Sequence, residues 1–507
     1  MLKKNILANF FGRVWPSVLG IITVPIFLRY LSIEAYGLVG FFLSLQAIIS
    51  FLDLGLSTTT NREVSIGLTV PENRQRTHDL IYTFEAIYAL ISIVIVLVSI
   101  FISNWLANEW INAKDLSVDI IQFAVVVFGS TLALRWPIAL YTGVLQGSES
   151  QVLNNLLSIV LSTFRVGGAL VFVAFVSHTI IAYLFWQFTF AFIEIIVMRN
   201  AAWKVLNKNG ILKPHWNFSL LSYVWRFSAS ISINSMLAAL LKQMDRFLIS
   251  NLLLLQQVGY YTTANVVYTA LSMMAFPFSA AAFPRFTSLI ATKNDALLAE
   301  TYHKLSQSVS FFVTPLTSII FFFSYEILLI WTRSPDVAAN AAPTLSILAL
   351  AAMFNSMMHI PFVLQLAAGI TRIALLNNAV NLIVLMPIMY YLISHFGIAG
   401  AGIAWAVFNV FYYLIVPQVM HLYLLPNEKW TWIFYDTFPF MVMCVLIYGG
   451  VYLLSEIIEK QFLMIILLMG SALYTSLCML IYPFIRALVM DLFINNLVIR
   501  KFVRIRK

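Results

Sequence analysis

Three charged side chains stand out in the apolar stretch LLKQMDRFLISNLLLLQQVGYY, residues 240–261. Lys242, Asp245 and Arg246 are spaced i, i+3 and i+4, so they share one face of a helix. A charge in an apolar interior is stable only when it meets an opposite charge or a strong hydrogen-bonding partner. This face is therefore predicted either to form an ion pair within the protein or to bind a charged ligand.

Other apolar segments also carry charges, and the two signs suggest different roles. The cations in or at the edges of these segments are Arg13, Arg62, Arg135 and Arg165. The acids are Asp53, Glu85, Glu194 and Glu326. Charged side chains are costly in hydrocarbon, so those that recur on one helical face are expected to face a cavity or a partner helix. The acids leave structural ion pairs as the competing interpretation.

Uncharged polar residues recur at helical spacing in two further segments. One stripe is formed by Gln46, Ser50, Asp53, Ser57 and Thr60, and another by Tyr261, Asn265, Tyr268 and Ser272. Such a face predicts the wall of a polar cavity, and tyrosine and amide side chains suit contact with a sugar. Packing between helices is the alternative for the small members, because small residues permit close approach.

The composition sets the elements that must position these residues. The chain has 507 residues, of which 61% are hydrophobic and 10% charged, so it is predicted to be an all-α polytopic membrane protein. Windows of about 20 apolar residues predict about fourteen membrane-spanning helices. Their approximate ranges are 6–31, 38–66, 78–105, 118–146, 151–177, 179–200, 219–250, 259–290, 302–331, 341–368, 372–395, 398–424, 433–455 and 462–485. Pro25, Pro137, Pro277 and Pro387 mark candidate kinks.

The net charge of +9 is distributed by side of the membrane rather than gathered in a nucleic-acid patch. Most of the 30 Lys and Arg residues lie at alternate segment ends, which predicts that both termini are cytoplasmic and that the basic tail 486–507 faces the inner leaflet.

Motifs for enzymatic chemistry do not occur in the sequence. There is no phosphate-binding P-loop, no G-x-S-x-G, no H-E-x-x-H and no Cys/His metal spacing, and Cys444 and Cys478 both lie in apolar spans. A non-enzyme without metal or cofactor is expected. Acids within apolar spans can bind a proton or a sodium ion, and Asp53, Glu194 and Asp245 are the candidates for coupling the protein to an ion gradient or the membrane potential.

Two motifs carry a resemblance to a known family. The run VPIFLRYLSIEAYGLVGFFLSLQAIISFLDLGLSTTTNREVS, residues 24–65, contains Tyr36-Gly37, then D-L-G-L from Asp53 to Leu56, then Arg62. The second motif is Asp245-Arg246 followed by Val258, Gly259 and Tyr261. The chain resembles the Wzx-type oligosaccharide flippases of the polysaccharide transporter family, in the superfamily that also holds multidrug-extrusion (MATE) carriers and lipid II flippases. The hairpin LLLLQQ lacks the glycine usual in that pattern.

This resemblance implies an architecture. The N-lobe is expected at 1–200, a cytoplasmic linker at 201–218, the C-lobe at 219–425, two further helices at 426–485 and a basic tail at 486–507. The two motifs also suggest an internal repeat, and transport would proceed by alternating access around a central cavity.

The resemblance also implies a substrate and partners. The substrate would be an undecaprenyl-diphosphate-linked oligosaccharide, moved across the bacterial inner membrane for O-antigen, capsule or exopolysaccharide synthesis. Its partners would be membrane lipids and the polymerase and glycosyltransferases of the pathway. The candidate substrate-binding residues are Arg13, Arg62, Arg135, Arg165, Lys242, Arg246, Gln46, Asn265 and Tyr268. A lipid II flippase and a drug or cation efflux carrier remain the alternatives, the latter because of the acids Asp53, Glu85 and Glu194. A polymerase would need a large external loop, which this sequence lacks.

Overall fold

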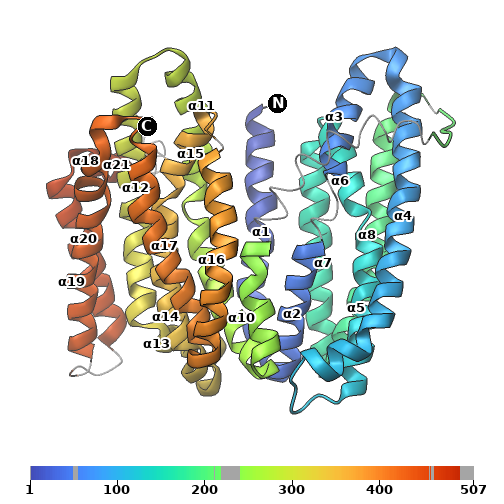
Figure 1. Cartoon of the computed structure of the whole chain (residues 1–507), viewed down its shortest axis with the longest axis horizontal. Helices are drawn as coiled ribbons and strands as arrows, with labels where there is room; N and C mark the ends of the chain where they lie inside the picture. The colour runs from blue at the N-terminus through green and yellow to red at the C-terminus, as the bar shows by residue number, and fades with distance from the viewer. Residues whose placement is uncertain are drawn as a thin grey trace, which may run out of the picture. The chain divides into compact units, whose positions relative to one another are not determined.

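The computed structural model describes residues 2–49, 55–210, 212–217, 240–370, 372–455, 457 and 462–491. Within these residues the regular structure is helical throughout (Figure 1). The first half contains α1 (Leu2–Tyr30), α2 (Ile33–Ile49), α3 (Leu56–Thr69), η2 (Pro71–Asn73), α4 (Arg74–Trp105), η3 (Leu106–Trp110), α5 (Val118–Arg135), α6 (Ile138–Gly147), α7 (Gln151–Phe175), α8 (Ile180–Leu206) and η4 (Asn207–Asn209).

The second half begins with the helical residues 240–252. They are followed by α10 (Leu255–Met273), α11 (Phe276–Ala291), α12 (Asp295–Phe322), α13 (Ser324–Thr332), α14 (Pro335–Met357), α15 (His359–Ala367), α16 (Arg372–Phe396), α17 (Ile398–Met420), η5 (Pro426–Glu428), α18 (Lys429–Thr431), η6 (Trp432–Thr437), α19 (Phe438–Ser455), α20 (Leu463–Ile481) and α21 (Pro483–Met490).

The apolar spans predicted from the sequence are confirmed where the structure describes them. Ten helical segments among the described residues are long and apolar enough to cross a membrane, and three shorter apolar helices join them. Each coincides with a predicted span. The predicted span 219–250 begins outside the described residues. The chain is a multi-pass membrane protein, because so many apolar helices of this length match the hydrocarbon thickness.

Several predicted spans consist of two helices, and the local sequence explains the breaks. Pro137 separates α5 from α6, and Pro277 lies in the first turn of α11, where its missing N–H removes no helical hydrogen bond. Gly55 precedes α3 with φ of 71°, a conformation that costs glycine little. The predicted kink sites Pro25 and Pro387 lie inside the continuous helices α1 and α16.

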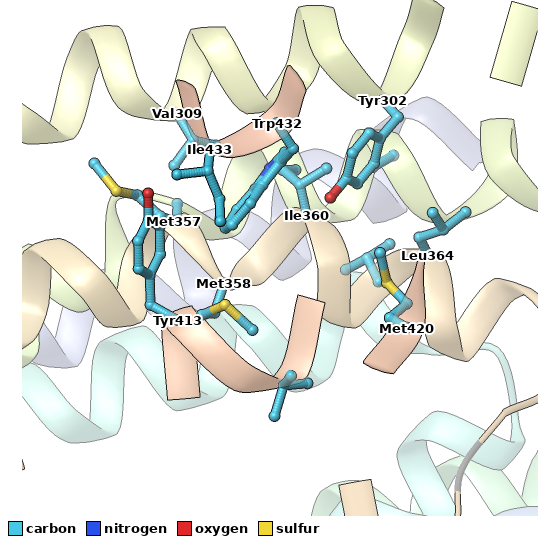
Figure 2. Close-up of a cluster of buried hydrophobic side chains, with 14 of the residues drawn as sticks. Tyr302, Val309, Met357, Met358, Ile360, Leu364, Tyr413, Met420, Trp432 and Ile433 are labelled. Carbon is cyan, nitrogen blue, oxygen red and sulfur yellow. The ribbon is translucent and has the colours of Figure 1, made fainter. Parts of the chain in front are cut away.

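The contacts divide the chain into two compact units. The first unit comprises Met1–Val266 and Asn378–Ile398, and the second comprises Val267–Asn377 and Ala399–Lys507. The helical residues 240–266 thus group with the N-terminal helices, whereas the sequence-based division begins the C-lobe at residue 219. In the second unit a core cluster gathers around Trp432, Tyr302, Tyr413 and Met420 (Figure 2), and α19 lies beside α20.

A reciprocal glycine contact joins α2 to α10 within the first unit. A Cβ built on Gly37 would overlap the carbonyl oxygen of Leu255, and one built on Gly259 would lie 2.5 Å from the carbonyl oxygen of Ile33. Both glycines therefore permit backbone-to-backbone approach. The same offset in residue number relates Ile33 to Leu255 and Gly37 to Gly259. This symmetry supports the internal repeat suggested by the two motifs.

Candidate functional site

Two arginines of the first unit converge on a single carboxylate. The Arg135 Nε atom donates to Oε2 of Glu194 at 2.9 Å, and the Arg165 Nε atom lies 4.0 Å from the same oxygen. The exposed fractions of these side chains are 17% for Arg135, 20% for Arg165 and 9% for Glu194. The three formal charges leave a net positive charge in an apolar part of the protein.

The sequence places Arg135 at the end of its helix. Because Pro137 interrupts the backbone hydrogen bonding, α5 ends at Arg135, where the helix dipole favours a cation. On α7, the backbone carbonyl of Arg165 accepts a hydrogen bond from the Trp186 indole Nε1 at 3.0 Å. The Trp186 ring packs where a Cβ on Gly168 would otherwise lie, so this glycine lets α7 and α8 approach.

A cavity of 370 Å³ opens beside the arginines. Polar residues of α2, α3, α5 and α6 line it, namely Gln46, Ser57, Thr58, Asn61, Arg135, Thr142 and Gln146. A narrow continuation shares Gln46 and Arg135 with it and reaches Arg165, Tyr183 and Gln187. Amide donors and guanidinium groups on one wall suit an anionic, hydroxyl-rich ligand.

The guanidinium of Arg165 has unused hydrogen-bonding capacity. Its Nε atom is buried and has no hydrogen-bond partner among the described residues. Buried polar groups are nearly always hydrogen-bonded, and an exception at a cavity wall marks a group that a ligand can satisfy. Because Glu194 pairs closely with Arg135 and only distantly with Arg165, Arg165 is the less neutralised of these two cations.

Other predicted charges form structural contacts. Glu85 accepts hydrogen bonds from Arg199 at 2.9 and 3.0 Å, from Tyr141 at 2.9 Å and from Trp203 at 2.7 Å. A carboxylate with this many donors is held as part of the fold. It lines neither the cavity nor its continuation.

The charged residues Lys242, Asp245 and Arg246 are not among the residues that line the cavity or its continuation. Asp245 is buried and accepts a hydrogen bond from Tyr261 at 2.5 Å, while Arg246 donates to Asn265 at 2.6 Å. Lys242 is exposed. These contacts tie residues 240–252 to α10, so the structure brings Asp245, Arg246 and Asn265 together.

The remaining predicted residues are dispersed. Arg62 lies on α3 with 47% of its side chain exposed and pairs with Glu63 at 2.7 Å. Tyr268 belongs to the second unit and packs near Leu271. The side chain of Arg13 and the whole of Asp53 lie outside the described residues.

The polar stripe predicted from Gln46 to Thr60 is described only at its two ends, because Ser50 and Asp53 lie outside the described residues. Gln46 and Ser57 line the cavity from separate helices, and Thr60 is buried where Gly143 of α6 packs on α3. Gly55, with φ of 71°, directly precedes α3, so Ser57 and Thr60 lie on a helix that begins at Leu56. The single polar face stays a prediction.

Sequence reasoning missed Tyr183 and Gln187, which line the continuation next to Arg165. A signal for them existed. Tyr183, Gln187 and Glu194 are spaced i, i+4 and i+11 on α8, so they share one helical face with the predicted Glu194.

Comparison with known proteins connects this geometry to a family. A family model described as polysaccharide biosynthesis protein matches residues 2–290. A Shigella flexneri protein named "Putative O-antigen transporter" is 23% identical over 405 residues, which cover 80% of this chain and 94% of that protein.

Solved structures share the fold. A lipid II flippase MurJ in an inward closed conformation aligns with a TM-score of 0.71 and 13% identity, covering 96% of this chain and 99% of that chain. An inward-facing multidrug resistance MATE family transporter of the MOP superfamily aligns with a TM-score of 0.62 and 14% identity, covering 80% and 95%. The fold is therefore MATE-like, as the resemblance implied. The family model covers more than half of the residues, and the chain is a membrane transporter that belongs to the polysaccharide biosynthesis protein family.

Proposed function

We propose that this protein is a flippase that moves an undecaprenyl-diphosphate-linked oligosaccharide from the inner to the outer leaflet by alternating access. One observation carries the proposal. Arg135 and Arg165 share a single carboxylate at a cavity wall, and the Nε donor of Arg165 has no hydrogen-bond partner within the part of the chain that the structure describes. A diphosphate entering an apolar region loses its hydration, and charge-assisted hydrogen bonds from guanidinium groups offset that loss.

The cavity chemistry also separates this proposal from its alternatives. A carrier for cationic drugs would need an uncompensated acid. Of the three acids that suggest such a carrier, Glu194 is paired with Arg135 and Glu85 with Arg199, and Asp53 lies outside the described residues. The polar lining of Gln46, Asn61 and Gln146 suits hydroxyl groups of a glycan. A lipid II flippase has a similar substrate with a diphosphate and sugars, so the assay below compares the two glycolipids directly.

Reconstitution in lipid vesicles tests the function. A glycolipid whose sugar is oxidised by a membrane-impermeant reagent is expected to react only in the outer leaflet of protein-free vesicles, and almost completely in vesicles that hold the protein. The matched control is a lipid that carries the same glycan without the diphosphate. If the diphosphate-linked oligosaccharide is protected equally with and without protein, the flippase proposal fails. Faster movement of lipid II than of the oligosaccharide would favour the alternative.

We also propose a bacterial inner-membrane location with both termini in the cytoplasm, because most Lys and Arg residues lie on the side of the N-terminus and of residues 201–218. Alkaline phosphatase fused after Lys208 is expected to be inactive, and the same enzyme fused after Asn112 is expected to be active. The opposite pair of signals would reverse the orientation. In this location the pathway's polymerase and glycosyltransferases are the proposed partners.

A further inference from the structure

A histidine of the second unit bridges two carboxylates. His303 lies on α12, and its Nδ1 atom contacts Oδ2 of Asp436 on η6. Its Nε2 atom lies 3.0 Å from Oε2 of Glu428 on η5. Gln307, one turn along α12, donates to the other oxygen of Asp436 at 2.8 Å. Asp436 itself is completely buried.

This geometry fixes the number of protons in the bridge. An ionised carboxylate only accepts hydrogen bonds, and a neutral imidazole has one N–H and one acceptor nitrogen. Both ring nitrogens of His303 face carboxylate oxygens, so two protons are needed for two hydrogen bonds. Either His303 is an imidazolium, or one of Asp436 and Glu428 is protonated. Loss of one proton breaks one of the two hydrogen bonds that His303 makes to Asp436 and Glu428.

A second observation comes from the other side of the cluster. His421, just after α17, is 1% exposed, and both of its ring nitrogens lack a hydrogen-bond partner among the described residues. Its ring meets that of Tyr302 edge to face at 5.7 Å, and the Tyr302 ring in turn meets that of His303. Burial and the neighbouring charge on His303 lower the pKa of His421 to about 4. His421 is therefore neutral at neutral pH. The additional proton of this cluster belongs to the bridge formed by His303, Asp436 and Glu428.

The charged and titratable groups around the bridge come from every packed element. They are Glu300, Tyr302 and Lys304 on α12, Tyr413 on α17, His421 after it, Glu428 on η5, Lys429 on α18, Tyr435 and Asp436 on η6, and Tyr482 after α20. Lys304 is paired with Glu300 on its own helix. Among the described residues, the cation that contacts Asp436 is therefore His303 in its protonated form.

Water can reach the bridge from one side. A groove of 640 Å³ is lined by His303, Lys304 and Gln307 together with Thr431, Tyr435 and Tyr482. The side chain of His303 is 16% exposed, whereas Asp436 behind it is not exposed. His303 thus stands between solvent and a buried carboxylate, a placement that permits proton exchange with the groove.

We propose that His303, Asp436 and Glu428 form a proton-binding site that makes the packing of η6 against α12 depend on pH. We call the arrangement with η6 packed against α12 seated, and the arrangement without this packing released. The seated arrangement binds one proton more than the released arrangement, in which Asp436 and Glu428 are ionised and His303 is neutral. The proton leaves to water in the groove. By linkage, acid pH favours the seated arrangement, and rising pH favours release. None of the acids in this site was a coupling candidate on sequence grounds.

Thiol labelling of the full-length protein tests this without any substrate, so its outcome is independent of the flippase proposal. Cys444 and Cys478 are replaced by Ala, and a single cysteine is introduced at Ile433, which is 7% exposed in the core beside Trp432 (Figure 2). A second protein carries its single cysteine at the exposed Thr431. Its labelling rate shows how much labelling rises with pH simply because the thiol ionises. The ratio of the two labelling rates is expected to rise about tenfold between about pH 6 and about pH 9, as one-proton linkage permits.

Two isosteric variants sharpen the result. In Asp436→Asn and Glu428→Gln the new amide supplies an N–H that neutral His303 accepts, so the bridge needs no second proton. In both variants the ratio is expected to stay low and flat across the range. His178→Gln, at an exposed histidine of the first unit, should keep the full rise. A flat ratio in the otherwise unchanged protein, or an undiminished rise in Glu428→Gln, overturns the proposal. Glu428 is 27% exposed, so that variant preserves the fold even if Asp436→Asn does not.

Discussion

Replacing Arg165 with Gln is expected to lower the rate of glycolipid flipping by about 10- to 100-fold, the loss of one or two charge-assisted hydrogen bonds to a buried diphosphate. Folding should survive, because Glu194 keeps its close partner Arg135 at 2.9 Å after the change. The measurement is the initial flipping rate in vesicles, normalised to the amount of reconstituted protein. Arg165→Lys should recover part of the rate, since it restores the charge without the planar donor geometry.

Two further variants decide whether Arg165 serves the substrate or only neutralises Glu194. If neutralisation is its role, the double variant Arg165→Gln/Glu194→Gln should regain activity. If Arg165 binds the diphosphate, the double variant should stay inactive. Arg62→Gln is the matched control, since Arg62 is half-exposed beside Glu63 and lines neither the cavity nor its continuation. Its flipping rate should change less than about twofold, as surface ion pairs contribute little.

Gly37→Leu is expected to prevent accumulation of folded protein, because the side chain would have to displace the backbone of α10 at Leu255. Even Gly37→Ala should destabilise by about 1–3 kcal/mol, the usual cost of forcing an extra carbon into a packed site. That sign is informative, because Ala in place of Gly inside an unobstructed helix stabilises by up to about 1 kcal/mol. The measurement is the thermal midpoint of the purified protein together with its yield as a single species.

Gly167→Ala is the matched control. This glycine lies inside α7, and a Cβ built on it meets no atom within 4 Å. The substitution should be neutral or stabilising, whereas Gly259→Ala should behave like Gly37→Ala because it meets the carbonyl oxygen of Ile33. Equal thermal midpoints for Gly37→Ala and Gly167→Ala would show that the contact between α2 and α10 is not tight.

The sequence was sufficient for the membrane helices but not for their interruptions or partners. Apolar windows predict spans because the membrane sets their length, and that prediction is confirmed in the described residues. The break before α3 depends on the positive φ of Gly55, which no apolar window reveals. Likewise, the pairing of Arg135 with Glu194 joins residues 59 positions apart, so spacing along one helix could not show it.

The contacts between His303 and Asp436 were also not predicted, because the start of the last-but-one predicted span was a few residues too late. The predicted span 433–455 placed Asp436 at the membrane edge, where an acid needs no partner. In the structure the helical segment starts at Lys429, and Asp436 is completely buried. The role of a charged residue near the end of a predicted span can therefore be assigned only once its tertiary contacts are known. For Asp245 the unforeseen partner was neutral, since it is the hydroxyl of Tyr261.

The reciprocal glycine contact also sets an order of events during synthesis. Ile33 and Gly37 leave the ribosome long before Leu255 and Gly259, and at a few to about twenty residues per second that interval is roughly 10 to 40 s. Throughout it the glycine face of α2 is in the membrane without its partner, although it is shaped for backbone contact. The first unit therefore cannot finish folding until α10 is made. A chain truncated after α8 should expose this face to other membrane helices and to the quality-control proteases that recognise it.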